Sequence, residues 1–247
     1  MTSDPRLQLP DVSFYQDDPA TPKGVDFRVM RRRTPACIMR AGQRTWPDRD
    51  FNKNWQAAKE AGLLRGAYWF YDSRSAPEAQ AELFAELLNR DFGDMPLWGD
   101  FEDTYLGPYG GWRNWYNFLA RLQKLTDGHE IGIYTGYYYW KEWTLGAGIP
   151  ISSLNWFAQF PLWIANYGAM FPLVPLPWKE WTLWQYTDNG DGTLYGVESL
   201  NIDLNYYNGS VEEFIDRWGG SAHVPDARWK LALDFSDGSR LNFKETL

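Results

Sequence analysis

The 247-residue chain is predicted to fold mainly as an α/β barrel, in which five βα units are followed by three strands joined by loops. Short apolar runs alternate with amphipathic segments through the first 143 residues, and the chain has the length of many single-domain barrels. After about residue 160, the intervals between apolar runs are too short for full helices and rich in Pro and Gly. These observations predict a TIM-like (β/α)5(β)3 order.

The expected elements follow from the spacing of apolar residues, because strands repeat every second residue and helices every three or four. The expected strands are 11–16, 36–42, 64–71, 97–102, 131–134, 161–166, 182–187 and 201–206, and the helices are 51–62, 75–89, 112–126 and 211–218. Ser75 is the expected N-cap of the second helix, and Pro77 lies in its first turn. The aromatic segment 137–143 is expected to be a loop.

The C-terminal residues are predicted to form a separate extension. Gly219 and Gly220 mark the boundary between a barrel of residues 1–218 and an extension of residues 219–247. Within the extension, segments 229–235 and 240–243 flank Ser-Asp-Gly-Ser, which is a hairpin signal. A lone hairpin is marginal in water, so we expect it to pack on the barrel, pair with a second copy or dock into an assembly.

The composition excludes some classes of function. A net charge of −8 argues against nucleic-acid binding, which depends on clustered Lys and Arg. The single cysteine, Cys37, excludes an internal disulfide, and two histidines offer no metal cluster, so no metal or other cofactor is expected. No window of ~18 uninterrupted apolar residues predicts a membrane span. The 18% aromatic content fits either a large core or surfaces that stack on sugars.

Asp100 and Glu102 lie two residues apart at the end of an expected strand. Side chains at i and i+2 share one face of a strand, so the two carboxyl groups point the same way. Two like charges in a partly desolvated place raise the pKa of one of them, which prepares a general acid beside an anion. For an isolated Asp-x-Glu, the alternative is a pair of solvated loop acids.

Two further acids are expected at the same end of the barrel. Asp11 lies on the first strand and Asp203 on the last, where Ile202 and Leu204 alternate with it and are expected to face outward. Functional groups of βα barrels project from the C-terminal ends of the strands, so these acids share one pocket with Asp100 and Glu102. Four acids without a matching cluster of bases indicate a carbohydrate-cleaving site.

The segments DVSFYQ, IMRAG, AGLLRGAYWFY, LWGDFE, IGIYTG, LWIANY, LWQYT and IDLNYYNGS together resemble glycoside hydrolase family 25, the Chalaropsis-type lysozymes. The resemblance extends over residues 9–218 and implies a flattened (β/α)5(β)3 barrel. It also implies hydrolysis of the β-1,4 bond between N-acetylmuramic acid and N-acetylglucosamine in peptidoglycan.

Position by position, the resemblance implies that Glu102 is the general acid and Asp100 the acid beside it, with Asp11 and Asp203 as the acids of the first and last strands. It implies a substrate-facing role for Arg40, Tyr68, Phe70, Tyr134, Trp163 and Gln185. A one-residue slip in a strand would turn any of the lining residues outward. The implied mechanism is retaining and substrate-assisted, with attack by the 2-acetamido group. A direct nucleophile or a base-activated water stays open.

Two other functions remain open at this point. The Pro-containing loop 17–27, the aromatic bulk of Trp69 and Tyr71, and the terminal hairpin depart from the family pattern. They leave room for a non-catalytic glycan-binding barrel in a phage assembly, or for a glycosidase on another N-acetylated polymer such as chitin. No secretory signal is visible, so a wall-acting enzyme would need another export route or release as a phage endolysin.

Overall fold

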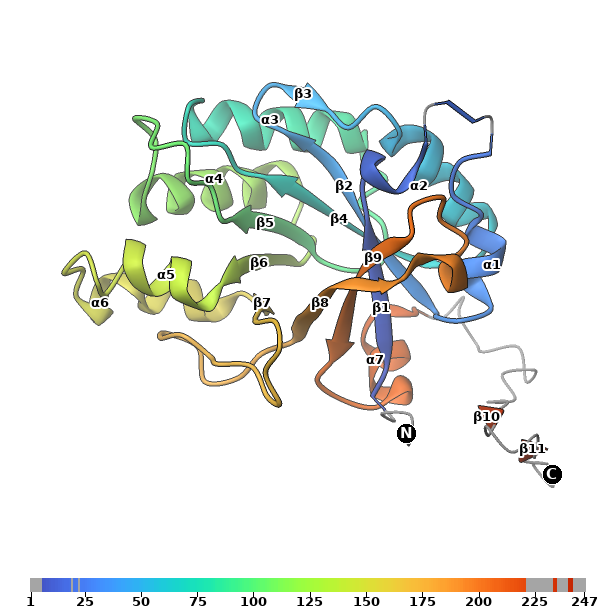
Figure 1. Ribbon diagram of the computed structural model, residues 1–247. Coiled ribbons are helices and arrows are strands. Elements are labelled where there is room, and N and C mark those ends of the chain that lie inside the picture. The colour runs from blue at the N-terminus through green and yellow to red at the C-terminus, as the bar shows by residue number, and fades with distance from the viewer. Residues whose placement is uncertain (1–5, 19, 22, 221–232, 235–239, 242–247) are drawn as a thin grey trace.

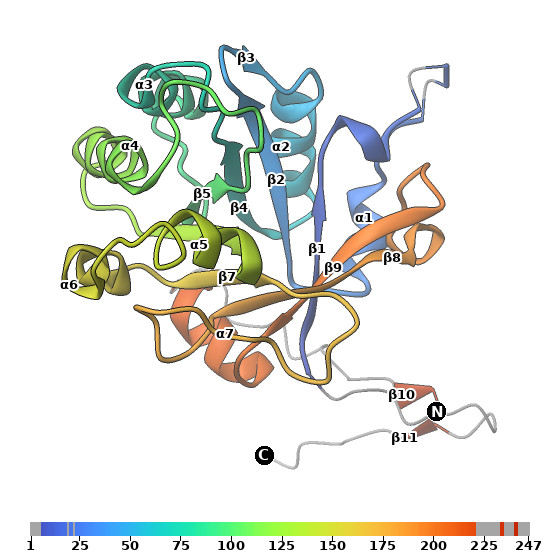
Figure 2. The ribbon, with the colours of Figure 1, turned by 60° about the vertical axis from the view of Figure 1, so that its left-hand side comes forward.

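The computed structural model describes residues 6–18, 20, 21 and 23–220, and the backbone of residues 233, 234, 240 and 241. Its main body is a closed barrel of eight strands wrapped by helices, seen from two directions in Figures 1 and 2. The barrel strands are β1 (Gln8–Val12), β2 (Ala36–Gln43), β4 (Leu64–Phe70), β5 (Leu97–Phe101), β6 (Ile131–Gly136), β7 (Leu162–Ala165), β8 (Leu183–Asp191) and β9 (Asn201–Tyr207). The short β3 (Trp46–Pro47) pairs antiparallel with the C-terminal end of β2.

Seven barrel strands are parallel to one another, and β9 closes the barrel by pairing antiparallel to both β8 and β1. The helices are α1 (Phe27–Arg31), α2 (Phe51–Glu60), α3 (Pro77–Leu88), α4 (Trp112–Leu125), α5 (Tyr137–Trp143), α6 (Ile151–Leu154) and α7 (Val211–Trp218). Three short 3-10 helices are η1 (Phe14–Gln16), η2 (Asn155–Gln159) and η3 (Gly192–Tyr195). The connections from β7 to β8 and from β8 to β9 contain no α-helix, so the predicted (β/α)5(β)3 order is confirmed.

Two hydrophobic layers hold the barrel together, one between the strands and the helices and one inside the barrel. Inside, Trp98 and Trp163 meet edge to face, with ring centroids 5.5 Å apart. A Cβ on Gly132 would lie 2.3 Å from the Trp98 ring, so glycine is required opposite this side chain. The aromatic content therefore belongs largely to the core, and the indole rings fill the barrel beneath its open end.

Some local predictions were wrong. The first strand ends at Val12, because Ser13 caps η1 through a reciprocal pair of hydrogen bonds with Gln16. The second long helix starts after Ala76, without a side-chain cap from Ser75. The expected aromatic loop 137–143 is the helix α5, because Trp140 is fully buried against Trp115, with ring centroids 5.2 Å apart. Packing overrides the modest helix propensity of aromatic residues here.

The helix predicted at residues 211–218 is α7. Trp218 donates through Nε1 to Glu130 at 2.8 Å, and Arg217 forms an ion pair with the same carboxylate. Beyond it, the two-residue strands β10 (Leu233–Asp234) and β11 (Arg240–Leu241) pair antiparallel inside the expected hairpin segments. The rest of that hairpin lies outside the described residues. Among the described helices, none is long and apolar enough to cross a membrane.

Candidate active site

The four predicted acids line one cavity of about 390 Å³ at the open end of the barrel. Asp11 comes from β1, Asp100 from β5 and Asp203 from β9, while Glu102 follows directly after β5. Arg40, Tyr68 and Phe70 line the same cavity, as do Ser13, Tyr15, Gln16, Gln43 and Tyr105. The topology therefore brings together acids that are distant in the sequence. Asp11 and Asp203 are 192 positions apart.

Asp203 reaches the cavity in a different way from the other acids. Because β9 runs antiparallel to its neighbours, the N-terminal half of this strand lies at the end where the parallel strands finish. The expectation that Asp203 projects from a C-terminal strand end is therefore wrong. It is the register partner of Asp11, and directly opposed residues have Cβ atoms about 4.5–5.5 Å apart. Ile202 and Leu204 pack in the outer layer, as predicted.

Burial raises the pKa values of all four acids, and the charges of neighbouring acids add to the shifts of Asp100, Glu102 and Asp203. Desolvation, followed by the charges of Glu102 and Asp11, raises the pKa of Asp100 well above its usual range. Desolvation raises the pKa of Glu102 to about 7, although a hydrogen bond with Tyr134 opposes the shift. The pKa of Asp203 rises to about 8 and that of Asp11 to about 6, again mainly through desolvation. The cluster therefore retains protons at neutral pH.

Arg40 is the base that the structure places beside these acids. Its Nε donates to Asp48 at 2.9 Å, and its guanidinium lies 4.6 Å from the Phe14 ring centroid. The strand is irregular at this point, with a register shift against β4 between Arg40 and Gly42. Only 7% of Arg40 is exposed, yet its Nη2 has no hydrogen-bond partner. A buried donor at the cavity wall is available to an acceptor on a ligand.

Three of the predicted substrate-binding residues lie beside or beneath the acids rather than among the residues that line the cavity. Tyr134, Trp163 and Gln185 are all buried, and their polar atoms bond to protein groups. Tyr134 donates to Gln185 Oε1 at 2.8 Å, and Gln185 donates from Nε2 to Asp11 Oδ2 at 3.0 Å. These residues face the barrel interior as expected, but they support the acids.

Sequence reasoning missed several residues at this site. Asn205 donates to Asp11 Oδ2 at 2.8 Å, and its position two residues after Asp203 in a strand was a usable signal. Asp48 holds Arg40, and the exposed rings of Tyr15 and Tyr105 edge the cavity. These three lie in loops or a 3-10 turn, where sequence periodicity carries no information about direction.

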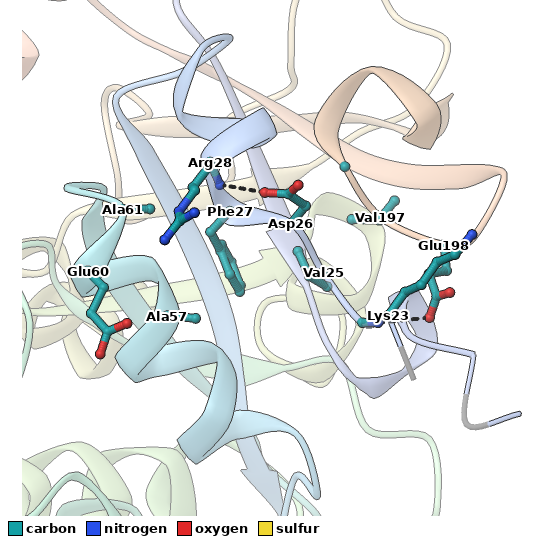
Figure 3. Close-up of a pocket in the computed structure, with 12 residues that line it drawn as sticks. Lys23, Val25, Asp26, Phe27, Arg28, Ala57, Glu60, Ala61, Val197 and Glu198 are labelled. Atoms are coloured by element: carbon teal, nitrogen blue, oxygen red, sulfur yellow. Dashed lines mark hydrogen bonds between the residues drawn. The ribbon is translucent and has the colours of Figure 1, made fainter. Parts of the chain in front are cut away.

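A second and larger cavity, of about 770 Å³, lies between α1, α2 and the segment after η3 (Figure 3). Its acids are already engaged: Asp26 accepts from the Arg28 amide at 3.0 Å, and Glu198 accepts from the Gly24 amide at 3.1 Å. Hydrogen bonds, first from Thr21, lower the pKa of Glu198 to about 2. A carboxyl group with a lowered pKa is a poor proton donor, so the cavity with four raised pKa values is the candidate active site.

Among the described residues, no group of three or more His, Cys, Asp and Glu side chains is arranged to hold a metal ion. The acid cluster lies at the mouth of a closed α/β barrel, beside an arginine and exposed tyrosines. This fold and this site together define a glycoside hydrolase.

Comparisons with known proteins agree with this class. A family model described as glycosyl hydrolases family 25 matches residues 11–193, so the chain belongs to this family. The chain is 32% identical over 181 residues to Lysozyme M1 of Streptomyces globisporus, which covers 69% of this chain and 58% of that protein. It is 29% identical over 171 residues to the uncharacterized protein YegX of Escherichia coli K12, which covers 67% and 57%. The chain thus spans less than two thirds of these relatives.

The fold is also similar to a solved structure over nearly its full length. The bacterial lysozyme from Streptomyces coelicolor superposes with a TM-score of 0.71 at 27% identity, covering 88% of this chain and 98% of that one. The predicted fold and the resemblance are therefore confirmed.

Proposed function

We propose that the protein is a lysozyme that hydrolyses the β-1,4 bond between N-acetylmuramic acid and N-acetylglucosamine in bacterial peptidoglycan, with retention of configuration. The observation that carries the proposal is the convergence of four carboxyl groups with raised pKa values in one cavity. The family and the similarity to two lysozymes support the same substrate.

Glu102 is the proposed proton carrier. With a pKa raised to about 7, it is largely protonated at or below neutral pH and can donate to the leaving oxygen. As the bond from C1 to that oxygen breaks, the oxygen of the 2-acetamido group forms a bond to C1. Ionised Glu102 then takes a proton from water, and this water opens the intermediate from the same face as the departed group, which gives net retention.

Asp100 is the proposed partner of the acetamido group. Its Oδ1 is buried and has no hydrogen-bond partner, so it can accept the amide N–H of a sugar. The sequence indicated a permanent anion beside the general acid, but the raised pKa favours a protonated Asp100. Positive charge that develops on the acetamido group favours ionisation of Asp100, because an opposite charge lowers the pKa of a carboxyl group.

Arg40 favours a substrate with a hydrogen-bond acceptor on its 3-substituent. Its unpartnered Nη2 can donate to the carbonyl oxygen of the lactyl group that N-acetylmuramic acid carries and that chitin lacks. Tyr68 and Phe70 line the cavity beside it, and the exposed rings of Tyr15 and Tyr105 offer apolar faces to neighbouring sugars. These features support peptidoglycan over an N-acetylated polymer that lacks the lactyl group.

The proposed domain organisation is a catalytic barrel of residues 1–218 followed by an extension of residues 219–247 that docks on a second copy or an assembly. An enzyme that acts on the cell wall works outside the cytoplasmic membrane, and it would arrive there either by export or, as a phage endolysin, by release from the host cytoplasm.

Digestion of purified peptidoglycan and of chitin, followed by mass spectrometry of the new reducing ends, tests the proposal. We expect N-acetylmuramic acid ends from peptidoglycan and little release from chitin. Release from chitin alone would identify the second polymer as the substrate. Binding without release, with Glu102→Gln behaving like the parent, would identify a non-catalytic glycan-binding barrel.

A further inference from the structure

The orientation of the Asn205 amide is fixed by a group that can only donate. The indole Nε1 of Trp163 donates to Asn205 Oδ1 at 2.6 Å, and an indole N–H has no acceptor capacity. The other end of the amide must then be Nδ2, which donates to the Leu9 carbonyl at 3.0 Å and to Asp11 Oδ2 at 2.8 Å. Asn205 is completely buried, so each of these bonds replaces water.

Gln185 repeats this arrangement from the neighbouring strand. Its Oε1 lies 2.8 Å from the Tyr134 hydroxyl and 2.6 Å from the Tyr167 hydroxyl, and both donate to it. Its Nε2 therefore points to Asp11 Oδ2, at 3.0 Å. The opposite orientation would place an amide oxygen against a carboxylate oxygen.

The two amides make the oxygens of Asp11 unequal. Both N–H groups point at Oδ2, so a proton on Oδ2 would face two donor hydrogens. Oδ1 receives no donor that the described side chains provide, and Asp11 lines the cavity. A proton on Asp11 therefore resides on Oδ1, where it can be exchanged with a water molecule or a sugar hydroxyl.

We propose that Asn205 is a positioning residue for Asp11. Together with Gln185, it occupies Asp11 Oδ2 with donated hydrogen bonds, so that Oδ1 is the oxygen that exchanges a proton in the cleft. The location of the proton follows from the hydrogen bonds alone. Its role in turnover rests on the proposed lysozyme function.

The same geometry opposes protonation of Asp11. Desolvation raises its pKa to about 6, while the hydrogen bonds from Asn205 and Gln185 lower it. Removal of either amide therefore raises the pKa further, because the ionised form loses a donor. The titratable groups that interact electrostatically with Asp11 are Asp203 on β9, Asp100 and Glu102 at β5, Cys37 on β2, Tyr68 on β4, Tyr134 on β6 and Tyr167 after β7. The charged Arg40 on β2 lines the same cavity.

The test follows the Asp11 carboxyl carbon by NMR during a pH titration of the substrate-free, 13C-Asp-labelled protein, with the signal assigned through Asp11→Asn. Asn205→Leu removes the amide without adding charge, and Trp163→Phe removes the indole donor that orients it, together with part of a buried ring. Asn201→Leu, at an exposed position on the same strand, is the matched control.

We expect the Asp11 midpoint to rise by about one pH unit in Asn205→Leu. It should rise less in Trp163→Phe and stay unchanged in the control. The acidic limb of the pH profile of kcat/KM should move in the same direction. Should Asn205→Leu not fold, the Trp163→Phe titration decides the question.

An unmoved midpoint in the folded variants would overturn the proposal and leave Asn205 as packing alone. The titration needs no turnover, so a shifted midpoint in a protein that releases no sugar would keep the role of Asn205 and reject the lysozyme function.

Discussion

The two ends of the barrel treat their acids differently. At the N-terminal end of the strands, Arg65 forms a bidentate ion pair with Asp91, at 2.7 and 3.0 Å. At the open end, Asp100 instead lies near the like charges of Glu102 and Asp11. Arg65 also lies 4.3 Å from the Trp55 ring centroid and donates its backbone N–H to Asp94. There the pKa of Asp91 falls to about 2, mainly through the hydrogen bonds from Arg65. Among the described ion pairs, none involves the four acids of the open end.

The difference in pKa between the two ends separates acids that stabilise the fold from acids that are candidates for catalysis. A paired carboxylate has a lowered pKa and adds stability at neutral pH, whereas a buried carboxyl with a raised pKa reduces it. Natural proteins retain such unfavourable groups where function requires them. The barrel is thus stabilised from one end and carries its candidate chemistry at the other.

The largest expected effect is on turnover in Glu102→Gln. We expect a loss of ~10²–10⁴-fold in kcat, because the amide cannot donate the proton that the leaving oxygen needs. The melting temperature should not fall, because this carboxyl forms no ion pair. Release of reducing ends and thermal melting measure the two quantities, and a stable variant with parental turnover would remove Glu102 from the mechanism.

The opposite pattern is expected for Arg65→Met. The substitution leaves Asp91 and Asp94 without their buried partner, and we expect a loss of roughly 2–3 kcal/mol in the free energy of unfolding. The figure lies below that of a fully buried pair because the Asp91 side chain is 38% exposed. Chemical denaturation measures it, and kcat of the folded fraction should match the parent. A large loss of kcat in a stable variant would contradict the division between the two ends.

A smaller effect is expected in the pH dependence of the parent. Glu102 must be protonated to donate, so kcat/KM should fall as the pH rises through about 7. Initial rates on peptidoglycan between pH 4 and 9 measure this limb. Rates that increase above pH 8 would show that the proton donor is another group.

Periodicity and composition predicted much of this arrangement. The alternation of apolar residues placed Asp203 on the inner face of its strand, and the i,i+2 spacing placed Asp100 and Glu102 on one face, since a period of two fixes the face of every residue in a strand. The expected role of Arg40 came from the family resemblance. Periodicity could not show that β9 runs antiparallel, which depends on how the last strand closes the barrel. Nor could it show the bonds from Asn205 and Gln185 to Asp11, because residues from distant strands meet only in the closed barrel.

The mechanistic roles of the four acids stay predictions, as does the domain boundary at residue 218. Asp48, Tyr15 and Tyr105 were missed for a physical reason, because their positions depend on loop conformation rather than on strand or helix repeats. Tertiary packing also decided the conformation of α5. The burial of its indole ring stabilises a helix whose aromatic residues have only modest helix propensity.

The most direct test of the contrast between the two ends is the same substitution at both, Asp203→Asn and Asp91→Asn, with melting temperatures measured at pH 7.5 and pH 4. The pKa of Asp203 is raised from 3.8 to about 8 on folding, so its contribution to stability is lost as the pH rises between these values. The pKa of Asp91 is lowered to about 2, so its contribution to stability is present above 3.8 and lost as the pH falls towards 2.

At pH 7.5 we expect Asp203→Asn to stabilise the protein and Asp91→Asn to destabilise it, each on the order of 1 kcal/mol, or about 2–4 °C. The gain from Asp203→Asn should largely disappear at pH 4. Destabilisation by both substitutions at pH 7.5 would contradict the account.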